Sequence, residues 1–148
     1  MSNFNIRLAY KEDLRSMYSV EKTSFAYPWS YDSFAENFYN AFSVYVLAEN
    51  EYGEVVGFGG MQVIFDEAHI MNIAVKKDFR RKGIADDMLC FMMSYAKEKG
   101  AAKMFLEVRR GNSPAQTLYL KHGFEVIAVR KNYYSDNGED AIIMTAEL

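Results

Sequence analysis

The sequence has one cysteine, Cys90, and two histidines among its 148 residues. A single cysteine cannot form an internal disulfide, and so few ligands give no metal-binding cluster, so we expect no metal. No apolar run approaches the roughly 18–20 residues that a membrane-spanning helix needs, so we expect no membrane segment. Because no basic segment followed by an apolar stretch opens the chain, the sequence predicts no signal peptide and a cytoplasmic location.

Basic residues are not in excess either, since 17 Lys and Arg stand against 20 Asp and Glu, a formal net charge of −3. This balance argues against a nucleic acid partner, which would need a clustered basic surface. It permits a basic peptide as partner, because acidic grooves attract such chains. A content of 50% hydrophobic and 25% charged residues is that of an ordinary globular protein. With no repeat and no linker-like stretch, residues 1–148 are expected to form a single domain.

The first half of the chain reads as a strand, two helices and a meander. Leu14 begins an apolar stripe at helical spacing, and Pro28 separates this helix from a second one that Ser30 can cap. Asn50–Gly53 supplies turn chemistry between two strand-like runs. The expected elements are a strand at Asn5–Leu8, helices near Lys11–Ser24 and from Ser30 to about Tyr39, and strands at Ser43–Glu49, Val55–Ile64 and Ala68–Val75.

An amphipathic helix opens the second half, with apolar residues recurring from Ile84 at a 3.6-residue period and a stop near Gly100. A further helix should start at Ser113, where a capping serine precedes Pro114 at the first helical position and Gln116 stands three residues past the cap. The other expected features are the end of that helix at His122 and strands at Met104–Val108, Phe124–Val129 and Ala141–Ala146.

The order of these elements predicts the sheet. Because a helix joins the Ala68–Val75 strand to the Met104–Val108 strand, these two strands should be parallel, with a right-handed crossover. The earlier strands follow one another through short turns and should be antiparallel. The predicted fold class is therefore α/β (α+β), a mixed and mostly antiparallel sheet flanked by helices.

A cluster of cations, Arg80, Arg81 and Lys82, stands with Gly83 between the Ala68–Val75 strand and the following helix. The N–H groups at a helix start point at one spot, and the helix dipole adds partial positive charge, so such a turn can bind an anion. Gly83 permits close approach of the backbone. From this segment alone, a solvated basic turn is an equally good interpretation. It is not a Walker A loop, because no Gly-Lys-Ser/Thr follows four spacer residues.

Two patterns here resemble motifs of the GNAT acetyltransferase family. The pattern Arg-x-x-Gly-x-Ala over residues 80–85 follows Asn72–Val75, and a second pattern spans Asn112–Phe124 with Ala115, Leu118 and Tyr119 inside it. The resemblance implies the GNAT fold, in which a central pair of parallel strands splays apart around acetyl-CoA. The implied acetyl-CoA-binding residues are Ile73, Ala74 and Val75 through their backbone, Arg81, Lys82, Gly83, Ile84, Ala85 and Asp86 around the pyrophosphate, and Asn112.

Acetyl transfer to an amine needs a base for the ammonium and an acid for the leaving thiolate. Glu107 lies on the strand that should border the splayed gap, and an α-amine with a pKa of about 7.7–8.0 needs only a modest base. From the residues alone, an ion pair between Glu107 and Arg109 on the same strand face is favoured over a catalytic role. Tyr119, a phenol with a pKa of about 10, either donates a proton to the thiolate or is an ordinary core tyrosine.

Further segments resemble a bacterial GNAT subfamily, the RimI-type enzymes that acetylate the N-terminal alanine of a ribosomal small-subunit protein. These segments are Leu106–Arg109, Tyr133-Tyr134, Glu139–Met144, Glu21 with Ser24-Phe25, and Pro28-Trp29-Ser30, so the resemblance spans roughly residues 4–144. It implies direct transfer in a ternary complex, with Glu107 as general base and Tyr119 as general acid. The implied acceptor-binding residues are Phe25, Trp29, Arg109, Tyr133 and Tyr134.

Two other functions stay open: a GNAT enzyme that acetylates a small-molecule amine, and a non-catalytic acyl-CoA-binding module. The segments around Trp29 and Tyr134 favour a peptide acceptor, and the presence of both Glu107 and Tyr119 favours an enzyme. Glu21 is expected either to balance a cationic substrate or to be a partly exposed helix acid. Cys90 is expected in the core rather than as a nucleophile.

Overall fold

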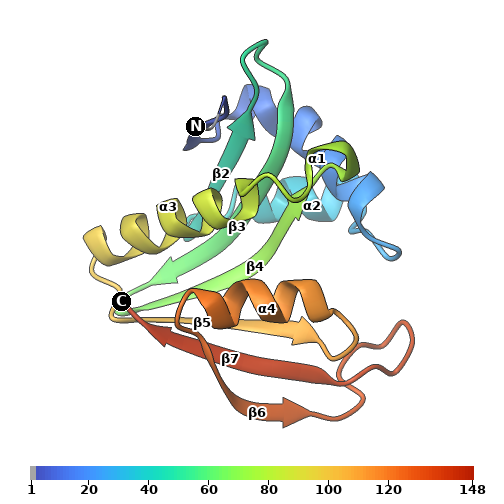
Figure 1. Ribbon diagram of the computed structural model, residues 1–148, viewed down its shortest axis with the longest axis vertical. Helices are drawn as coiled ribbons and strands as arrows, with labels where there is room; N and C mark the ends of the chain where they lie inside the picture. Colours follow the sequence, from blue (N-terminus) through green and yellow to red (C-terminus); the bar gives the residue numbers. More distant parts are fainter. Residues whose placement is uncertain (1–2) are drawn as a thin grey trace.

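A mixed sheet with helices on both faces forms the frame of the computed structural model, which describes residues 3–148 (Figure 1). Within these residues the sheet has seven strands in the order β1-β2-β3-β4-β5-β7-β6. The strands are β1 (Asn5–Leu8), β2 (Ser43–Glu49), β3 (Val55–Ile64), β4 (Glu67–Val75), β5 (Lys103–Arg109), β6 (Glu125–Arg130) and β7 (Ala141–Glu147). The helices are α1 (Leu14–Ser24), α2 (Tyr31–Phe38), α3 (Ile84–Glu98) and α4 (Ser113–Lys121), with short 3-10 turns η1 (Lys11–Asp13) and η2 (Lys77–Phe79).

β4 and β5 are the parallel neighbours in this sheet, and the other described neighbours are antiparallel. Their pairing joins Glu67–Ile70 to Lys103–Leu106 and ends there, although β4 continues to Val75 and β5 to Arg109. Figure 1 shows β4 and β5 diverging from a shared edge. The predicted mixed sheet with a splayed parallel pair is therefore confirmed.

A β-bulge lies in β4 at the point where the two strands part. Asn72 pairs with Gly60 and Ile70 with Met61, which leaves Met71 as the extra residue. A bulge bends its strand and re-aims the neighbouring side chains. Opposite it, β3 has glycine because a Cβ on Gly60 would lie 2.6 Å from a ring carbon of Tyr45. The local sequence of β3 thus accommodates the bend in β4.

The two faces of the sheet carry separate cores. On one face, α1 and α2 cover an aromatic cluster that includes Phe34, Tyr45 and Phe58. On the other face, the core under α3 and α4 includes Met88 and Met92 from α3. Burial of these apolar side chains is the main favourable term in the folding free energy, and it fixes the helices on both sides of the splayed strands.

The helix starts depart from the sequence expectation at two places: α1 begins at Leu14, because Lys11–Asp13 forms a 3-10 turn, and α4 has another cap. The Ser30 hydroxyl caps α2 by accepting a hydrogen bond from the Ser33 N–H, as predicted. The cap of α4 was predicted at Ser113 but is Asn112, whose side-chain oxygen accepts from the Ala115 N–H at 3.2 Å. Gln116 does not complete a capping box, because its amide donates to the carbonyls of Arg109 and Arg110. With Asn112 as the cap, Ser113 is the first helical residue of α4 and Pro114 the second.

Alternate residues of β5 differ in burial. Met104, Leu106 and Val108 are buried, whereas Phe105 and Glu107 are partly exposed. Successive side chains of a strand point to opposite faces, so Phe105 and Glu107 share one face. We call this surface of β4, β5 and β7 the open face.

Candidate functional site

A cavity of about 410 Å³ lies beside the splayed end of β5 and the loop between α1 and α2. We call it the β5-side cavity. Its lining includes eight of the residues that the sequence predicted as functional: Phe25, Trp29, Ile73, Glu107, Arg109, Asn112, Tyr119 and Tyr134.

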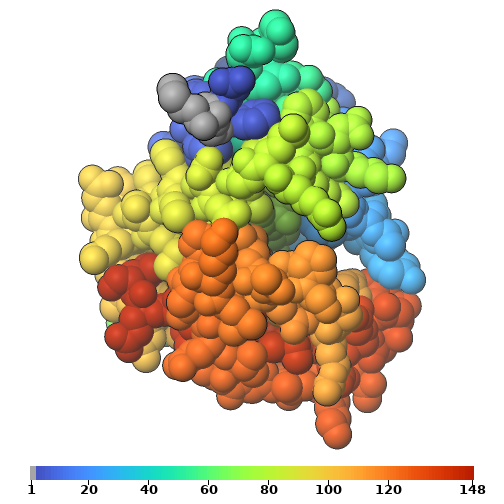
Figure 2. Space-filling view, in the orientation of Figure 1, coloured from blue at the N-terminus to red at the C-terminus, as the bar shows by residue number. Residues whose placement is uncertain are grey.

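A second cavity, of about 640 Å³, lies between the end of β4, the start of α3 and the α4 helix. We call it the α3-side cavity. The predicted cofactor residues in its lining are Ile73, Ala74, Val75, Arg81, Gly83, Ile84, Ala85, Asp86 and Asn112. In Figure 2 the yellow-green residues before α3 lie directly above the orange α4 helix, with the blue α1–α2 loop to their right.

The two cavities share part of their walls. Both are lined by Ser24, Phe25, Ile73, Asn112, Ala115 and Tyr119. Tyr119, the predicted general acid, is thus part of the wall that the two cavities have in common. Two predicted site residues, Lys82 and Tyr133, stand outside both linings.

The turn before α3 has an unusual backbone conformation. Gly83, the residue before the helix, has φ +80°, and Arg81 has φ +63°, so the turn uses the left-handed region twice. The Arg80 side chain donates to the Val75 carbonyl at 3.0 Å and ties the turn to the end of β4. Among residues 3–148, no side chain caps this helix. Gly83, Ile84 and Ala85 line the α3-side cavity, so the uncapped start of the helix and the partial positive charge of its dipole lie at the cavity wall.

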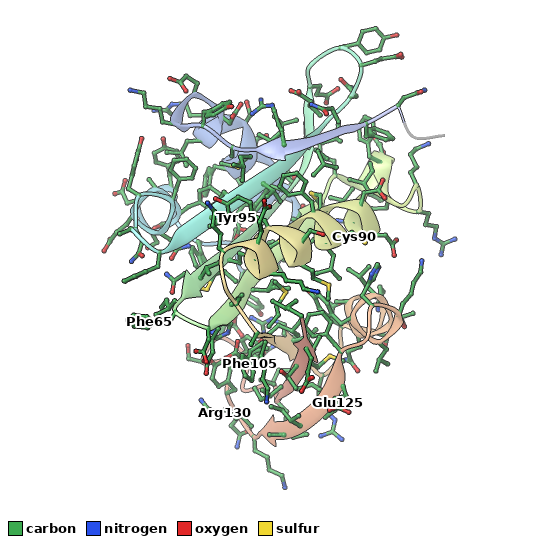
Figure 3. The ribbon with its side chains drawn as sticks, turned by 90° about the vertical axis from the view of Figure 1, so that its left-hand side faces the viewer. Phe65, Cys90, Tyr95, Phe105, Glu125 and Arg130 are labelled. Carbon is green, nitrogen blue, oxygen red and sulfur yellow. The ribbon has the colours of Figure 1, made fainter. Side chains whose placement is uncertain are left out.

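Asp86 lies in this cavity without leaving an uncompensated negative charge. It accepts from His122 Nε2 at 2.8 Å and forms an ion pair with Lys121 Nζ at 3.0 Å. The hydrogen bond from His122 is the main reason that the pKa of Asp86 is below its usual value. The neighbouring Cys90 is exposed on the part of α3 nearest α4, with Sγ 3.8 Å from His122 Nδ1, so the predicted core position of Cys90 is wrong (Figure 3).

Glu107 has a partner that spacing did not reveal. Its Oε2 lies 2.6 Å from Nε2 of His69, 38 residues earlier in the chain. This bond holds the pKa of Glu107 below its usual value and raises that of His69. Arg109 instead pairs with Asp136 and Glu139. The ion pair between Glu107 and Arg109 that the bare sequence favoured is therefore not formed.

Tyr119 is buried in the wall common to both cavities, with its ring edge-on against Phe124 at 5.5 Å between centroids. Burial raises the pKa of its phenol above the usual value of about 10. The hydroxyl therefore stays protonated at neutral pH, as a proton donor requires.

Arg109 and Tyr134 form the outer wall of the β5-side cavity. The guanidinium carbon of Arg109 lies 3.9 Å from the centroid of the Tyr134 ring, a cation–π contact. Burial raises the pKa of Tyr134 to about 12. Tyr133 packs edge-on against Tyr134 and is 42% exposed. Tyr133 thus borders the wall from outside.

Glu21 is buried, with 2% of its surface exposed, so it is not the partly exposed helix acid that one interpretation expected. Its two oxygens accept from the Trp29 N–H at 3.0 Å and the Asn72 side-chain amide at 2.9 Å. Burial raises the pKa of Glu21. These bonds tie the α1–α2 loop to β4.

Two polar residues of the β5-side cavity were missed by the sequence reasoning. Ser24 Oγ and Asn72 Oδ1 are buried and have no hydrogen-bond partner within the described part of the chain. Buried polar atoms without partners are costly, so a ligand that donates hydrogen bonds would be stabilised here. Both residues stand in segments that carry the family resemblance, Asn72–Val75 and Ser24-Phe25, but neither belongs to a residue pattern that indicates a binding role.

Metal-binding clusters and membrane-spanning helices are both absent from residues 3–148. Within this range no group of three or more His, Cys, Asp or Glu side chains is placed to hold a metal ion. The described helices include none that is long and apolar enough to cross a membrane. The titratable side chains of interest are the carboxylate of Glu107, which lines the β5-side cavity, and the phenol of Tyr119, which lines both cavities.

Known proteins with similar sequences are named as N-acetyltransferases. The ribosomal protein bS18-alanine N-acetyltransferase of Escherichia coli K12 is 38% identical over 134 residues, which cover 89% of each chain. The Haemophilus influenzae enzyme of the same name is 34% identical over 139 residues, covering 92% of this chain and 93% of its own. A Bacillus subtilis protein whose name proposes the same activity is 41% identical over 141 residues, 95% of this chain and 91% of its own.

Solved structures agree with these relatives. The crystal structure of the E. coli enzyme matches with a TM-score of 0.90 and 34% identity, covering 97% of this chain and 93% of that one. Ard1 from Thermoplasma volcanium matches with a TM-score of 0.89 and 27% identity over 99% of both chains. The model of the acetyltransferase (GNAT) family matches residues 12–124, most of the sequence. From this match, the relatives and the splayed parallel strands, the chain belongs to the GNAT family of acetyltransferases.

Proposed function

We propose that this enzyme transfers the acetyl group of acetyl-CoA to the α-amine of the N-terminal alanine of the ribosomal small-subunit protein bS18. The observation that carries the proposal is the junction of the two cavities, where Tyr119 borders both and Glu107 lines one of them. The bS18 acceptor is supported by the names of relatives at 38% and 34% identity. A ribosomal acceptor implies a reaction in the cytoplasm.

In the proposed complex, acetyl-CoA occupies the α3-side cavity. β4 has no β5 partner beyond Ile70 in the described sheet, so the backbone of Ile73–Val75 can pair with the pantetheine amides as an added strand would. Asn112, at the cap of α4, contacts the cofactor where the two cavities meet. The pyrophosphate is assigned to the start of α3, with Arg81, Lys82, Gly83, Ile84, Ala85 and Asp86 around it.

The acceptor N-terminus is assigned to the β5-side cavity. Phe25 and Trp29 from the α1–α2 loop and Arg109 and Tyr134 on the opposite side line it, and we assign Tyr133 to its outer edge. Its volume of about 410 Å³ is in the range of sites that hold small groups, so it suits the end of an extended peptide.

The chemistry then follows from the two titratable groups. Glu107 removes a proton from the acceptor ammonium, and the free amine attacks the thioester carbonyl to form a tetrahedral intermediate. The nitrogen of this intermediate then releases its second proton to solvent as the amide bond forms. The C–S bond breaks, and the Tyr119 hydroxyl donates its proton to the leaving thiolate. The phenol regains a proton from solvent. The direct attack needs no acyl-enzyme intermediate.

A panel of acceptors tests the substrate class. With acetyl-CoA, a peptide that copies the N-terminus of bS18 and begins with alanine should gain one acetyl group on its α-amine, measured by mass spectrometry. The same peptide with a blocked N-terminus is the control and should stay unmodified. Acetylation of polyamines, antibiotics or free amino acids without any peptide acetylation would contradict the proposed acceptor. No acetylation of any amine would instead support a non-catalytic acyl-CoA-binding module.

The Glu107→Gln substitution tests the base. It should lower kcat by about 10²-fold near neutral pH and leave the acetyl-CoA Kd unchanged. The defect should shrink as pH rises through about 7.7–8.0, because above this range the α-amine is already deprotonated. A kcat profile against pH, measured with saturating peptide, checks this. An equal defect at every pH is the result that rules out the base role.

The Tyr119→Phe substitution tests the acid. Loss of the hydroxyl should slow thiol release and lower kcat by about 10²-fold, with peptide KM within about twofold of the parent value. Steady-state kinetics with a thiol-detecting reagent measures both constants. Tyr52→Phe is the control, because Tyr52 is 86% exposed in the turn between β2 and β3. If KM alone changes, Tyr119 is a binding residue and not the acid.

The Gly83→Val substitution tests the phosphate turn. Gly83 has φ +80°, which strains a β-branched residue by about 1–3 kcal/mol. The turn should therefore shift, and the acetyl-CoA Kd should rise about tenfold or more, measured by calorimetry. Gly53→Val is a matched control, because Gly53 also has φ +80° and open space around it but lies in the β2–β3 turn. Equal cofactor affinity in both variants contradicts the assignment.

A further inference from the structure

His69 and Glu107 meet where the sheet divides. His69 belongs to β4 and Glu107 to β5, and the last paired residues of these strands are Ile70 and Leu106. His69 pairs in register with Phe105, which lies two residues before Glu107 and on the same face of β5. The two side chains therefore share the open face, where His69 Nε2 lies 2.6 Å from Glu107 Oε2.

The two members of this pair differ in position relative to the cavity. Glu107 lines the β5-side cavity, whereas His69 is not part of its lining. The His69 side chain is 46% exposed and that of Glu107 is 24% exposed. The carboxylate thus stands between the cavity and the imidazole, and the imidazole stands between the carboxylate and solvent.

The charges around the pair are few. Glu67, on the same strand as His69, acts on it with the same sign as Glu107 and raises its pKa further. Arg130, on β6, acts on Glu107 and lowers its pKa. Figure 3 places Arg130, like Phe105 from β5, in the half of the molecule below α3. Glu107 in turn acts on Tyr134, in the loop before β7, and raises the pKa of its phenol.

This pairing limits what Glu107 can do alone. A carboxylate whose pKa is held below its usual value is a poor acceptor for a proton from an α-ammonium of pKa about 7.7–8.0. Two coupled groups, however, take up protons as a unit. The first proton taken up by the pair is held on His69, whose pKa is raised above its usual value of about 6.5. The proton affinity of the pair is therefore closer to that of the α-amine than the proton affinity of the carboxylate alone.

We propose that His69 completes the base by receiving, through Glu107, the proton that the acceptor ammonium loses, and by passing it to solvent. The N–H bond of the ammonium breaks as an O–H bond forms on Glu107. Water then carries this proton from Glu107 to the free Nδ1 of His69, so the O–H bond breaks and an imidazolium forms beside the Glu107 carboxylate. The imidazolium releases its Nδ1 proton to solvent, and its Nε2–H group continues to donate to Glu107.

His69 touches neither substrate nor the reacting atoms, so it is a positioning and relay residue that acts through Glu107. The inference rests on the proposed assignment of the acceptor amine to the β5-side cavity. It adds a residue, and a route for the proton, that the assignment of Glu107 as base does not contain.

The decisive variant is His69→Gln, which keeps a hydrogen-bonding side chain but cannot take up a proton. In the parent enzyme, kcat with saturating bS18 peptide should fall as pH decreases, with a midpoint above about 6.5. The variant should lose that midpoint and lower kcat about tenfold near pH 7, with peptide KM and acetyl-CoA Kd within about twofold. Lys103→Gln is the matched control, because Lys103 lies on the open face two residues before Phe105 and should leave the profile unchanged.

Two further measurements do not depend on that variant. His69→Ala should regain part of its kcat when imidazole is added to the assay, whereas Glu107→Gln should not. The chain has two histidines, so imidazole NMR can follow each one. The His69 signal should titrate above about 6.5 in the parent enzyme and nearer that value in Glu107→Gln.

The outcomes separate the inference from the proposed function. If the parent enzyme acetylates the bS18 peptide but His69→Gln keeps its kcat and its pH midpoint, the relay is overturned and the function stands. A lower kcat with an unchanged midpoint and no rescue by imidazole also overturns it, since His69 would then be structural. If the parent enzyme fails to acetylate any peptide, the proposed function fails, and the relay fails with it whatever the NMR titration shows.

Discussion

The loss of pairing between β4 and β5 is the constraint on which the rest of the site depends. The strands are bonded as far as Ile70 and Leu106, and beyond that point each turns its backbone groups toward a gap. Buried backbone groups need hydrogen-bond partners, so such a gap must hold water or a ligand. The bulge at Met71 bends β4 at this point. A fold that opens its own sheet in this way leaves an unpaired strand edge of the kind to which an extended ligand can add as a further strand.

The same strand organises both cavities. At its splayed end, β4 contributes Ile73 to both linings and leads into the turn before α3. Through Asn72 it also holds Glu21, which in turn fixes the Trp29 backbone in the α1–α2 loop. Burial of a carboxylate is costly unless it is hydrogen-bonded, and here both of its oxygens are. The proposed donor and acceptor sites are thus positioned by one rigid element, which favours reaction through orientation.

Local patterns predicted the fold well and side-chain partnerships poorly. The bounds of β1, β2 and β3 agree with the sequence expectation because turn residues and strand-forming residues alternate cleanly there. The cap of α4 was displaced by one residue because Asn112 and Ser113 both have capping chemistry. The pairing of Glu107 with His69 could not be predicted, since it depends on the register of two parallel strands 38 residues apart in the chain. The burial of Glu21 likewise depends on how a loop folds back over β4.

The two candidate acid–base groups are shifted in opposite directions, and the surroundings explain why. Burial raises the pKa of Tyr119, while a hydrogen bond to His69 lowers that of Glu107. Groups whose environments separate their pKa values in this way suit opposite roles. The two groups also exchange protons with solvent on different sides of the site. Tyr119 lies in the wall that both cavities share, whereas Glu107 is hydrogen-bonded to His69, whose half-exposed side chain lies on the open face. A proton taken from the amine would therefore leave on the side away from the thiolate, so the two transfers need not compete for one path.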